Sequence, residues 1–189
     1  MTIFFHWTTV VLIASIIASA VAISHARNAK AIGFLLTIHR SLGATVWLTT
    51  VLRLLWRQTF AYFPPFPGHM HVIHRWVVTT SEKILYTLLV IQPLTGLGDT
   101  LLRGCQFSLF SFTIPAVLPA APVVAGLFHT LHYGGAVILF CLIGAHAAAA
   151  LLHHFVLRDD VLRAMLPWLR PAGRPLRDLR PTEKAVELR

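Results

Sequence analysis

The stretch Val123–Leu157, VVAGLFHTLHYGGAVILFCLIGAHAAAALLHHFVL, contains no aspartate, glutamate, lysine or arginine. A helix needs roughly 20 mostly apolar residues to cross a bilayer, and this stretch is longer, so we expect its end to project beyond the hydrocarbon. Polar side chains are costly inside a membrane and usually serve a function there. The histidines within the stretch are therefore candidate functional residues.

Three other stretches have the length and composition of a membrane span: Ile3–Ile23, Phe34–Leu55 and Ile84–Leu102. Of the 189 residues, 56% are hydrophobic and 12% are charged. A soluble domain carries about a quarter charged residues, so the composition excludes a soluble and also a disordered protein. The sequence predicts an all-α membrane protein, a four-transmembrane-helix bundle over residues 1–157 with a cytoplasmic C-terminal tail over residues 158–189.

The connections between the spans differ in character. Ser24–Ala31 is short and polar, and Gln58–Thr80 contains the turn-forming sequence Phe63-Pro64-Pro65-Phe66-Pro67-Gly68. Gly104–Gly126 is apolar and contains three prolines, so we expect it to lie at the membrane interface. The tail is charged and contains prolines, which favours a short amphipathic helix followed by a loose segment.

Basic residues are distributed unevenly along the chain, which has 16 Lys and Arg, 7 Asp and Glu, and a net charge of +9. In a soluble protein this excess would suggest nucleic acid, but here the basic residues avoid the apolar runs. They are expected to collect on the cytoplasmic side of a membrane. This rule predicts cytoplasmic termini. No nucleic-acid partner is expected, and the expected location is a bacterial inner (plasma) membrane. The outer side then keeps only four basic residues: Arg27, Lys30, Arg40 and Arg103.

The first span has a competing interpretation. Ala18-Ser19-Ala20 resembles the small-residue site at which a signal peptide is cleaved. No basic residue precedes the apolar run, however, and His6 and Trp7 near its start are unusual for a signal peptide. We therefore expect this span to stay in the protein.

Histidines occur at matching depths in three of the spans. His146 follows His132 by 14 residues. In a helix that spacing corresponds to roughly 21 Å and ends within about 40° of the starting direction, so the two imidazoles lie on one side at two depths. One metal ion cannot reach both. Counting from the membrane surfaces pairs His39 with His132 on the outer side and His6 with His146 on the inner side.

Two facing imidazoles without a carboxylate or a thiolate suit an iron porphyrin held from both sides. A structural zinc site normally takes four protein ligands, whereas each depth here supplies two. Neither Cys105 nor Cys141 belongs to a C-x-x-C-H sequence, so two haem b groups would be bound without covalent attachment. Small residues flank the histidines and would let a macrocycle approach, although they also favour close helix packing: Gly43, Gly134, Gly135, Gly144 and Ala145–Ala150.

The remaining histidines are weaker candidates. His129 lies one turn before His132 and could replace it as a ligand. His153 follows His146 by seven residues, near the inner surface. There it could donate a hydrogen bond to a quinone carbonyl, or simply extend to the interface. Contact with water or lipid headgroups is expected for four others: His25, His69, His71 and His74.

The third span contains no histidine, and Gln92-Pro93 predicts a kink in it. We expect this helix to pack against the others without binding iron. At its inner end, Glu82 and Lys83 are expected to anchor the helix at the interface rather than to transfer protons.

Taken together, these residues resemble the bacterial cytochrome b561 family, in particular its short di-haem members. The resemblance covers about residues 4–170, in the same order and spacing. The most specific match is Gly144-Ala145-His146-Ala147-Ala148-Ala149-Ala150-Leu151-Leu152-His153-His154. The other matches are Phe5-His6-Trp7, Ile38-His39 with Gly43, Val51-Leu52-Arg53-Leu54, Leu85-Tyr86, Gln92-Pro93-Leu94-Thr95-Gly96 and His132.

The resemblance implies a four-helix bundle with two haems b, and it assigns their iron ligands to His6, His39, His132 and His146. It also implies electron exchange with ubiquinone and, in the most similar members, oxidation of superoxide at the outer face. One position departs from the family pattern. The family often has a histidine four residues before the tyrosine of its Leu-Tyr motif, whereas this chain has Glu82 there, which puts quinone chemistry at the inner end in question.

Three functions follow from these observations. An oxidoreductase of the superoxide:ubiquinone type would use the outward basic residues to attract an anion, although the same residues could bind anionic lipid. Only an electron moves in the outer step, so no residue is assigned as a catalytic acid or base. Alternatively, the chain is a cytochrome b subunit that links a partner dehydrogenase or redox protein to the quinone pool. A non-redox transporter or structural bundle would leave the matched histidines unexplained.

Overall fold

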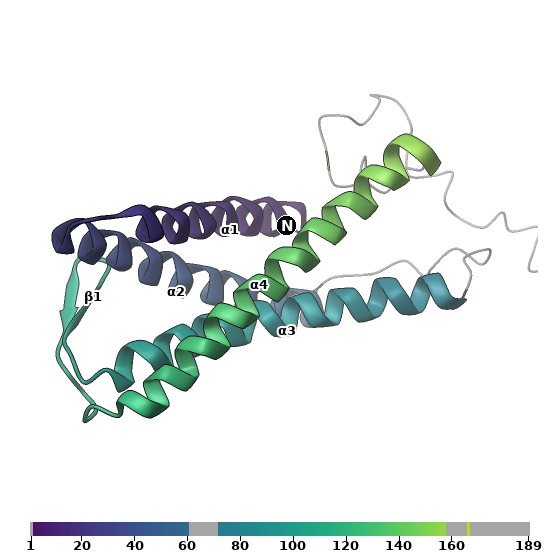
Figure 1. The fold of residues 1–189 in the computed structure, drawn as a ribbon. Helices are drawn as coiled ribbons and strands as arrows, with labels where there is room; N and C mark the ends of the chain where they lie inside the picture. The colour runs from purple at the N-terminus through teal and green to yellow at the C-terminus, as the bar shows by residue number, and fades with distance from the viewer. Residues whose placement is uncertain (1, 61–71, 158–165, 167–189) are drawn as a thin grey trace, which may run out of the picture. The chain divides into compact units, whose positions relative to one another are not determined.

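The computed structural model describes residues 2–60, 72–157 and 166 (Figure 1). Each of its long α-helices contains a window that is long and apolar enough to cross a membrane, which confirms the predicted all-α membrane fold. The elements are α1 (Thr2–His25), α2 (Ala29–Thr59), α3 (Val72–Leu102), β1 (Phe107–Leu109), β2 (Phe112–Ile114), α4 (Pro122–Leu152) and a π-helical turn, η1 (His153–Leu157).

The third helix differs most from its predicted bounds. α3 begins at Val72, whereas the predicted span begins at Ile84. The prediction that places Val72–Thr80 in a connection is therefore wrong. Hydropathy marks only the lipid-embedded part of a helix, while the backbone hydrogen bonds continue into the interface. The turn-forming Phe63–Gly68 and the predicted amphipathic helix after Arg158 lie outside the described residues.

The connection Gly104–Gly126 contains a hairpin that the sequence does not predict. β1 and β2 pair antiparallel, with Phe107 opposite Ile114. Phe107 is buried, and the backbone N–H of Phe110 in the turn donates to the Ser41 hydroxyl of α2 at 2.6 Å. These contacts fix the hairpin on one end of α2, which we call the outer end. Strands of three residues are too short for an alternating pattern to be recognised.

α1 and α2 lie side by side and antiparallel (Figure 1). The predicted polar connection between them is shorter in the structure, because α2 already begins at Ala29. Asn28 caps this helix, since its side-chain oxygen accepts a hydrogen bond from the backbone N–H of Ala31 at 2.7 Å. α2 also packs against α3, so it is the helix that neighbours both α1 and α3.

The first half of α4 approaches α3 closely at glycines. A Cβ built on Gly98 would lie 2.5 Å from a phenylalanine ring of α4, and a Cβ built on Gly96 would lie 2.9 Å from the His132 ring. A Cβ on Gly135 would overlap the Gln92 side chain. Small residues let membrane helices pack closely, and here they bring α3 side chains against His132.

Large apolar side chains cover the outsides of the helices. Val123 is 86% exposed and Phe34 is 66% exposed, values that suit contact with lipid rather than water. Buried side chains in the described part of the chain include several polar ones. Of these, Ser19 and Gln92 contact histidines, and Thr100 contacts Arg40.

The chain forms two compact units, Met1–Ala147 and Ala148–Arg189. The four histidines predicted as iron ligands all belong to the first unit. The described part of the second unit is mainly helical and consists of the last residues of α4 followed by η1, which begins with His153.

Candidate functional site

The structure brings His39 of α2 together with His132 of α4 at the outer end. The centroids of their rings lie 6.2 Å apart, and the ring planes are inclined at 85°. An iron held between two Nε2 atoms by metal–imidazole bonds of about 2.0–2.1 Å would place the ring centres roughly 6.4 Å apart. The observed separation therefore matches the space that one iron needs between two axial imidazoles.

The hydrogen bonds of His39 fix which ring nitrogen is available. Its Nδ1 lies 2.9 Å from the Ser19 hydroxyl of α1. That hydroxyl donates its own hydrogen to the carbonyl of Ile16 at 2.7 Å, so Nδ1 must carry the proton and donate to Ser19. The lone pair of the neutral ring then lies on Nε2, the nitrogen that can bind a metal.

His132 reaches the same state through α3. Its Nδ1 lies 2.9 Å from the backbone carbonyl of Gln92 and 3.2 Å from the Thr95 hydroxyl. A carbonyl oxygen can only accept, so Nδ1 carries the proton and Nε2 keeps the lone pair. Metal-bound histidines almost always donate their other N–H in this way, which fixes the ring and raises its basicity. Both outer rings are thus prepared as metal ligands.

The backbone beside the outer pair leaves room for a flat group. A Cβ built on Gly43, which lies one turn after His39, meets no other atom within 4 Å. Within the described residues, no group of three or more His, Cys, Asp or Glu side chains could hold a metal ion. The site therefore offers two imidazoles whose separation suits one iron, with open space beside Gly43. This arrangement fits a haem better than a bare metal ion.

The inner pair is less organised. His6 of α1 is half-buried, lies edge-on to the Trp7 ring at 5.6 Å, and interacts electrostatically with Arg53 and His146. His146 itself is exposed. Among the described residues, neither ring has a hydrogen-bond acceptor like those at the outer pair. The structure therefore places these two histidines near one another without fixing either imidazole.

Unsatisfied polar atoms lie along the inner half of α2. The Nε1 of Trp47, the Oγ1 of Thr50 and the Nε of Arg53 are buried without a hydrogen-bond partner among the described residues. Unpaired buried polar groups cost free energy, so each is expected to have a partner in the loaded protein. A haem carries propionate groups, and one of them could pair with Arg53 beside His6.

Glu82 of α3 pairs with Arg57 of α2. Two guanidinium nitrogens of Arg57 contact the two carboxylate oxygens, and one of these contacts, from the second nitrogen, is 2.9 Å long. The guanidinium carbons of Arg53 and Arg57 lie 5.3 and 5.6 Å from the centre of the Tyr86 ring, within cation–π range. The inner end therefore carries an arginine–tyrosine–glutamate cluster.

The other histidines fall into separate places. The Nδ1 of His129 lies 3.2 Å from a carboxylate oxygen of Asp99. His25 is exposed at the end of α1, and its Nδ1 lies near the Val21 carbonyl. His153 is half-buried and belongs to the second unit, Ala148–Arg189. His69 and His71 lie outside the described residues, and His74 lies within α3.

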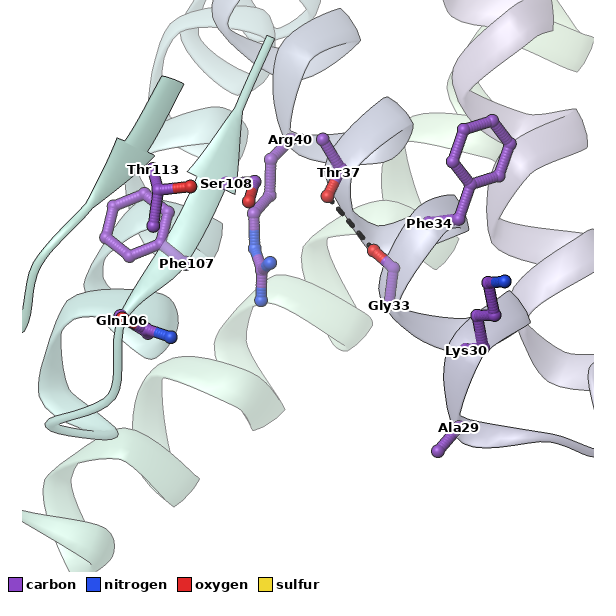
Figure 2. Close-up of a pocket in the computed structure, with 10 residues that line it drawn as sticks. All are labelled: Ala29, Lys30, Gly33, Phe34, Thr37, Arg40, Gln106, Phe107, Ser108 and Thr113. Atoms are coloured by element: carbon purple, nitrogen blue, oxygen red, sulfur yellow. Dashed lines mark hydrogen bonds between the residues drawn. The ribbon is translucent and has the colours of Figure 1, made fainter. Parts of the chain in front are cut away.

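A pocket of about 380 Å³ lies at the outer end between α2 and the hairpin. Figure 2 shows Arg40 extending from α2 toward the hairpin, with Lys30 and Phe34 nearer the start of the same helix. The Nε of Arg40 donates to the Thr100 hydroxyl at 3.3 Å, and its guanidinium carbon lies 5.6 Å from the Phe107 ring centre. Arg40 interacts electrostatically with His39, so the cationic pocket lies near the outer histidine pair.

Sequence reasoning missed the residues that hold the ligands. In the sequence, Ser19 stands out only within Ala18-Ser19-Ala20, which resembles a signal-peptide cleavage site. Gln92 stands out only as the residue before a proline that predicts a helix kink. A hydroxyl in an otherwise apolar span is a usable signal, because such groups pair with something at that depth. The backbone carbonyl of Gln92 leaves no signal of its own in the sequence.

Comparisons with known proteins identify the family of this chain. Residues 1–168 match the family model described as prokaryotic cytochrome b561. A probable superoxide oxidase CybB of Yersinia pestis is 31% identical over 137 residues, which cover 69% of this chain and 73% of the relative. Cytochrome b561 homolog 2 of Escherichia coli (strain K12) is 31% identical over 130 residues (68% and 69%), and homolog 1 is 29% identical over 136 residues (68% and 73%).

Proposed function

The chain belongs to the prokaryotic cytochrome b561 family, and on that premise we propose that it transfers electrons from superoxide at the outer face to ubiquinone. It is a multi-pass bacterial membrane protein and a haem-binding cytochrome b of electron transport. The donor is inferred from the Yersinia pestis relative, a probable superoxide oxidase. We propose the inner membrane as its location, and the distribution of basic residues favours cytoplasmic termini.

We assign His39 and His132 to an outer haem b, and His6 and His146 to an inner one. The separation and fixed tautomers of the outer rings support the first assignment. The electrostatic contact of His6 with His146 supports the second. When bound, the two haems supply one-electron carriers at two depths of the membrane.

The outer pocket supports an anionic donor. Lys30 and Arg40 line it, and Arg40 directly follows a proposed iron ligand. Clustered charge of one sign raises the local concentration of an oppositely charged substrate and its rate of arrival. These side chains would therefore draw superoxide toward the outer histidine pair, where it needs only to lose an electron.

The overall reaction balances without an acid or base at the outer face. Two superoxide anions give up one electron each and become two molecules of O₂. One ubiquinone takes up both electrons, together with two protons from the solvent, and becomes ubiquinol.

Quinone reduction needs polar groups that can reach its carbonyl oxygens. We place this reaction at the inner end, where Arg53, Tyr86 and the Arg57–Glu82 pair gather. His153, seven residues beyond His146, belongs to the second unit and is a separate candidate for a hydrogen bond to a quinone carbonyl. Lipid surrounds the spans, so the quinone would enter from the membrane.

The single observation that carries this proposal is the cationic pocket near His39 and His132, two histidines whose ring separation suits one iron. Its test is stopped-flow mixing of the oxidised protein with superoxide, followed by the visible spectrum of reduced haem. We expect rapid reduction in the natural protein and slower reduction in Lys30→Glu, with a difference that shrinks at high salt. Lys83→Glu, at the opposite end, serves as the control and should leave the rate unchanged.

Absence of haem reduction by superoxide would contradict the proposed donor. Reduction by a co-purifying dehydrogenase or other redox protein would then favour the alternative, an electron-transfer subunit that serves the quinone pool.

A further inference from the structure

Two histidines of α4 lie one turn apart, and each contacts a different residue of α3. His132 contacts Gln92, and His129 contacts Asp99. Gln92 and Asp99 are themselves seven residues apart, so they lie on the same side of α3, two turns from one another. The two helices run antiparallel, so the deeper residue of α3 meets the deeper histidine. α3 therefore contacts both candidate ligands at once.

Gln92 holds His132 at two points. Its side-chain amide donates to the backbone carbonyl of His132, and its own backbone carbonyl accepts the Nδ1–H of the His132 ring at 2.9 Å. Gln92 is only 8% exposed, so water competes weakly for these bonds. One residue thus fixes both the position of the His132 backbone and the orientation of its ring.

The space for this arrangement depends on two glycines. The His132 ring lies against Gly96, where a Cβ would come within 2.9 Å of the ring carbon Cε1 and 3.1 Å of Nδ1. The Gln92 side chain lies over Gly135, where a Cβ would overlap it. Any larger residue at either position would push His132 away from Gln92.

Asp99 contacts the neighbouring histidine nearer the outer end of α3. Its carboxylate lies 3.2 Å from the Nδ1 of His129 and 2.9 Å from the guanidinium of Arg103. The Asp99 side chain is 16% exposed, so it is a partly buried acceptor already oriented by Arg103. His129 is tied to the outer part of α3, while the His132 ring is the one that meets His39.

We propose that α3 selects His132 rather than His129 as the α4 ligand of the outer haem, with Gln92 and Asp99 as positioning residues. This inference rests on the proposed function, because it takes His39 as the opposite ligand. Gln92 holds the correct imidazole in place with its Nε2 available, and Asp99 restrains the competing imidazole one turn away. A helix without an iron ligand at this depth would thereby determine the coordination of the iron.

The sharpest test removes the selected ligand and then releases the competitor. A haem with two axial imidazoles has no site for carbon monoxide, whereas a haem with one imidazole binds it. We expect purified His132→Ala to bind carbon monoxide at the outer haem. In His132→Ala/Asp99→Ala, the released His129 should take the vacant position, and carbon monoxide binding should be lost.

Three outcomes of this experiment would overturn the selection by Asp99. The first is that carbon monoxide binding is unchanged between the single and the double variant. The second is that His132→Ala does not bind carbon monoxide and gains this binding only after His129→Ala is added, since His129 would then ligate without release. The third is that adding His129→Ala to the double variant fails to restore carbon monoxide binding.

A second arm tests Gln92 with both histidines intact, and it decides the matter if His132→Ala retains no outer haem. In Gln92→Leu the side-chain tether is lost, so the Nδ1–H bond should loosen and His132 should become a weaker donor. We expect the midpoint potential of the outer haem to rise and its electron paramagnetic resonance g values to shift, because these depend on the angle between the axial rings. Thr87→Val, an exposed change on the same helix, is the matched control.

Unchanged potential and g values in Gln92→Leu would refute the role of Gln92. The proposed function fails in a distinguishable way. In that case the unmodified protein itself would lack a haem with two imidazole ligands at the outer level, before any variant is compared.

Discussion

The outer and inner histidine pairs use the same chemistry but differ in how firmly the protein holds them. At the outer level, Ser19 and Gln92 accept hydrogen bonds from the Nδ1–H groups of His39 and His132. The centroids of these two rings lie 6.2 Å apart, a separation that suits one iron. At the inner level His146 is exposed, and His6 packs edge-on against the Trp7 ring. Paired histidines therefore determine which ligands a site offers, whereas residues of neighbouring helices determine how the imidazole rings are oriented.

The difference also has a consequence for electron transfer. An acceptor on Nδ1–H raises the basicity of a ligand and favours the oxidised iron, which lowers the potential of the haem. Removing ligands or their acceptors at each level therefore tests the comparison directly.

The largest effect is expected from removing the ligands themselves. His39→Ala/His132→Ala should remove the outer haem and leave the inner one, and His6→Ala/His146→Ala should do the reverse, because each double variant leaves one pair intact. The pyridine haemochrome assay should count about one haem per chain in either double variant, the result expected of two independent sites. Loss of both haems in His39→Ala/His132→Ala would contradict the division into two levels.

A smaller but substantial effect is expected at Gly96. In Gly96→Ala the new methyl group would collide with the His132 ring, which cannot move away without losing the Gln92 carbonyl. We expect lower occupancy of the outer haem, with the inner haem retained, as measured by haem content and visible spectrum. Gly126→Ala on α4 is the control, because a Cβ there meets nothing within 4 Å.

Equal haem loss in Gly96→Ala and Gly126→Ala would show that glycine is needed only for helix packing. The comparison would then lose one of its structural supports.

A modest effect is expected at Ser19. Ser19→Ala removes the acceptor of the His39 Nδ1–H, a hydrogen bond of the kind worth about 1 kcal/mol. The outer midpoint potential should rise by less than about 60 mV, which is a tenfold change for one electron. Ser15→Ala, whose hydroxyl bonds only its own helix, should leave the potential unchanged in the same redox titration.

If Ser19→Ala shifts the inner potential instead, the assignment of Ser19 to the outer pair is wrong.

The smallest effect is expected at the Arg57–Glu82 pair. The two side chains are 32% and 41% exposed, and exposed ion pairs contribute about 0–1 kcal/mol. Glu82→Gln should therefore change the thermal midpoint only slightly, as followed by circular dichroism in detergent. A large loss of stability would show that this cluster, rather than the outer pair, is the most tightly organised polar site.

Much of the fold could be predicted from the sequence because lipid imposes a simple rule. Four apolar stretches of sufficient length gave four helices, and only the start of α3 was badly misplaced. The polar beginning of that helix lies beyond the region where hydropathy is informative. The hairpin Phe107–Ile114 was missed because its strands are too short to show a pattern.

The candidate site was predictable only in part. The spacing of His132 and His146 reveals two depths, because helix geometry is regular. The orientation of each ring is not encoded in that spacing, since it depends on a backbone carbonyl of Gln92 and on a hydroxyl of Ser19 from other helices. Contacts between helices arise from packing, which a single sequence does not display.

The most direct test of this account is the haem content of the purified protein, combined with its reduced-minus-oxidised visible spectrum. The account predicts two b-type haems per chain, both with two imidazole ligands and with separate midpoint potentials. A single haem bound to His39 and His132 would support the outer site and contradict the assignment of His6 and His146 to an inner one. A protein that carries no haem when prepared with haem in excess would contradict it.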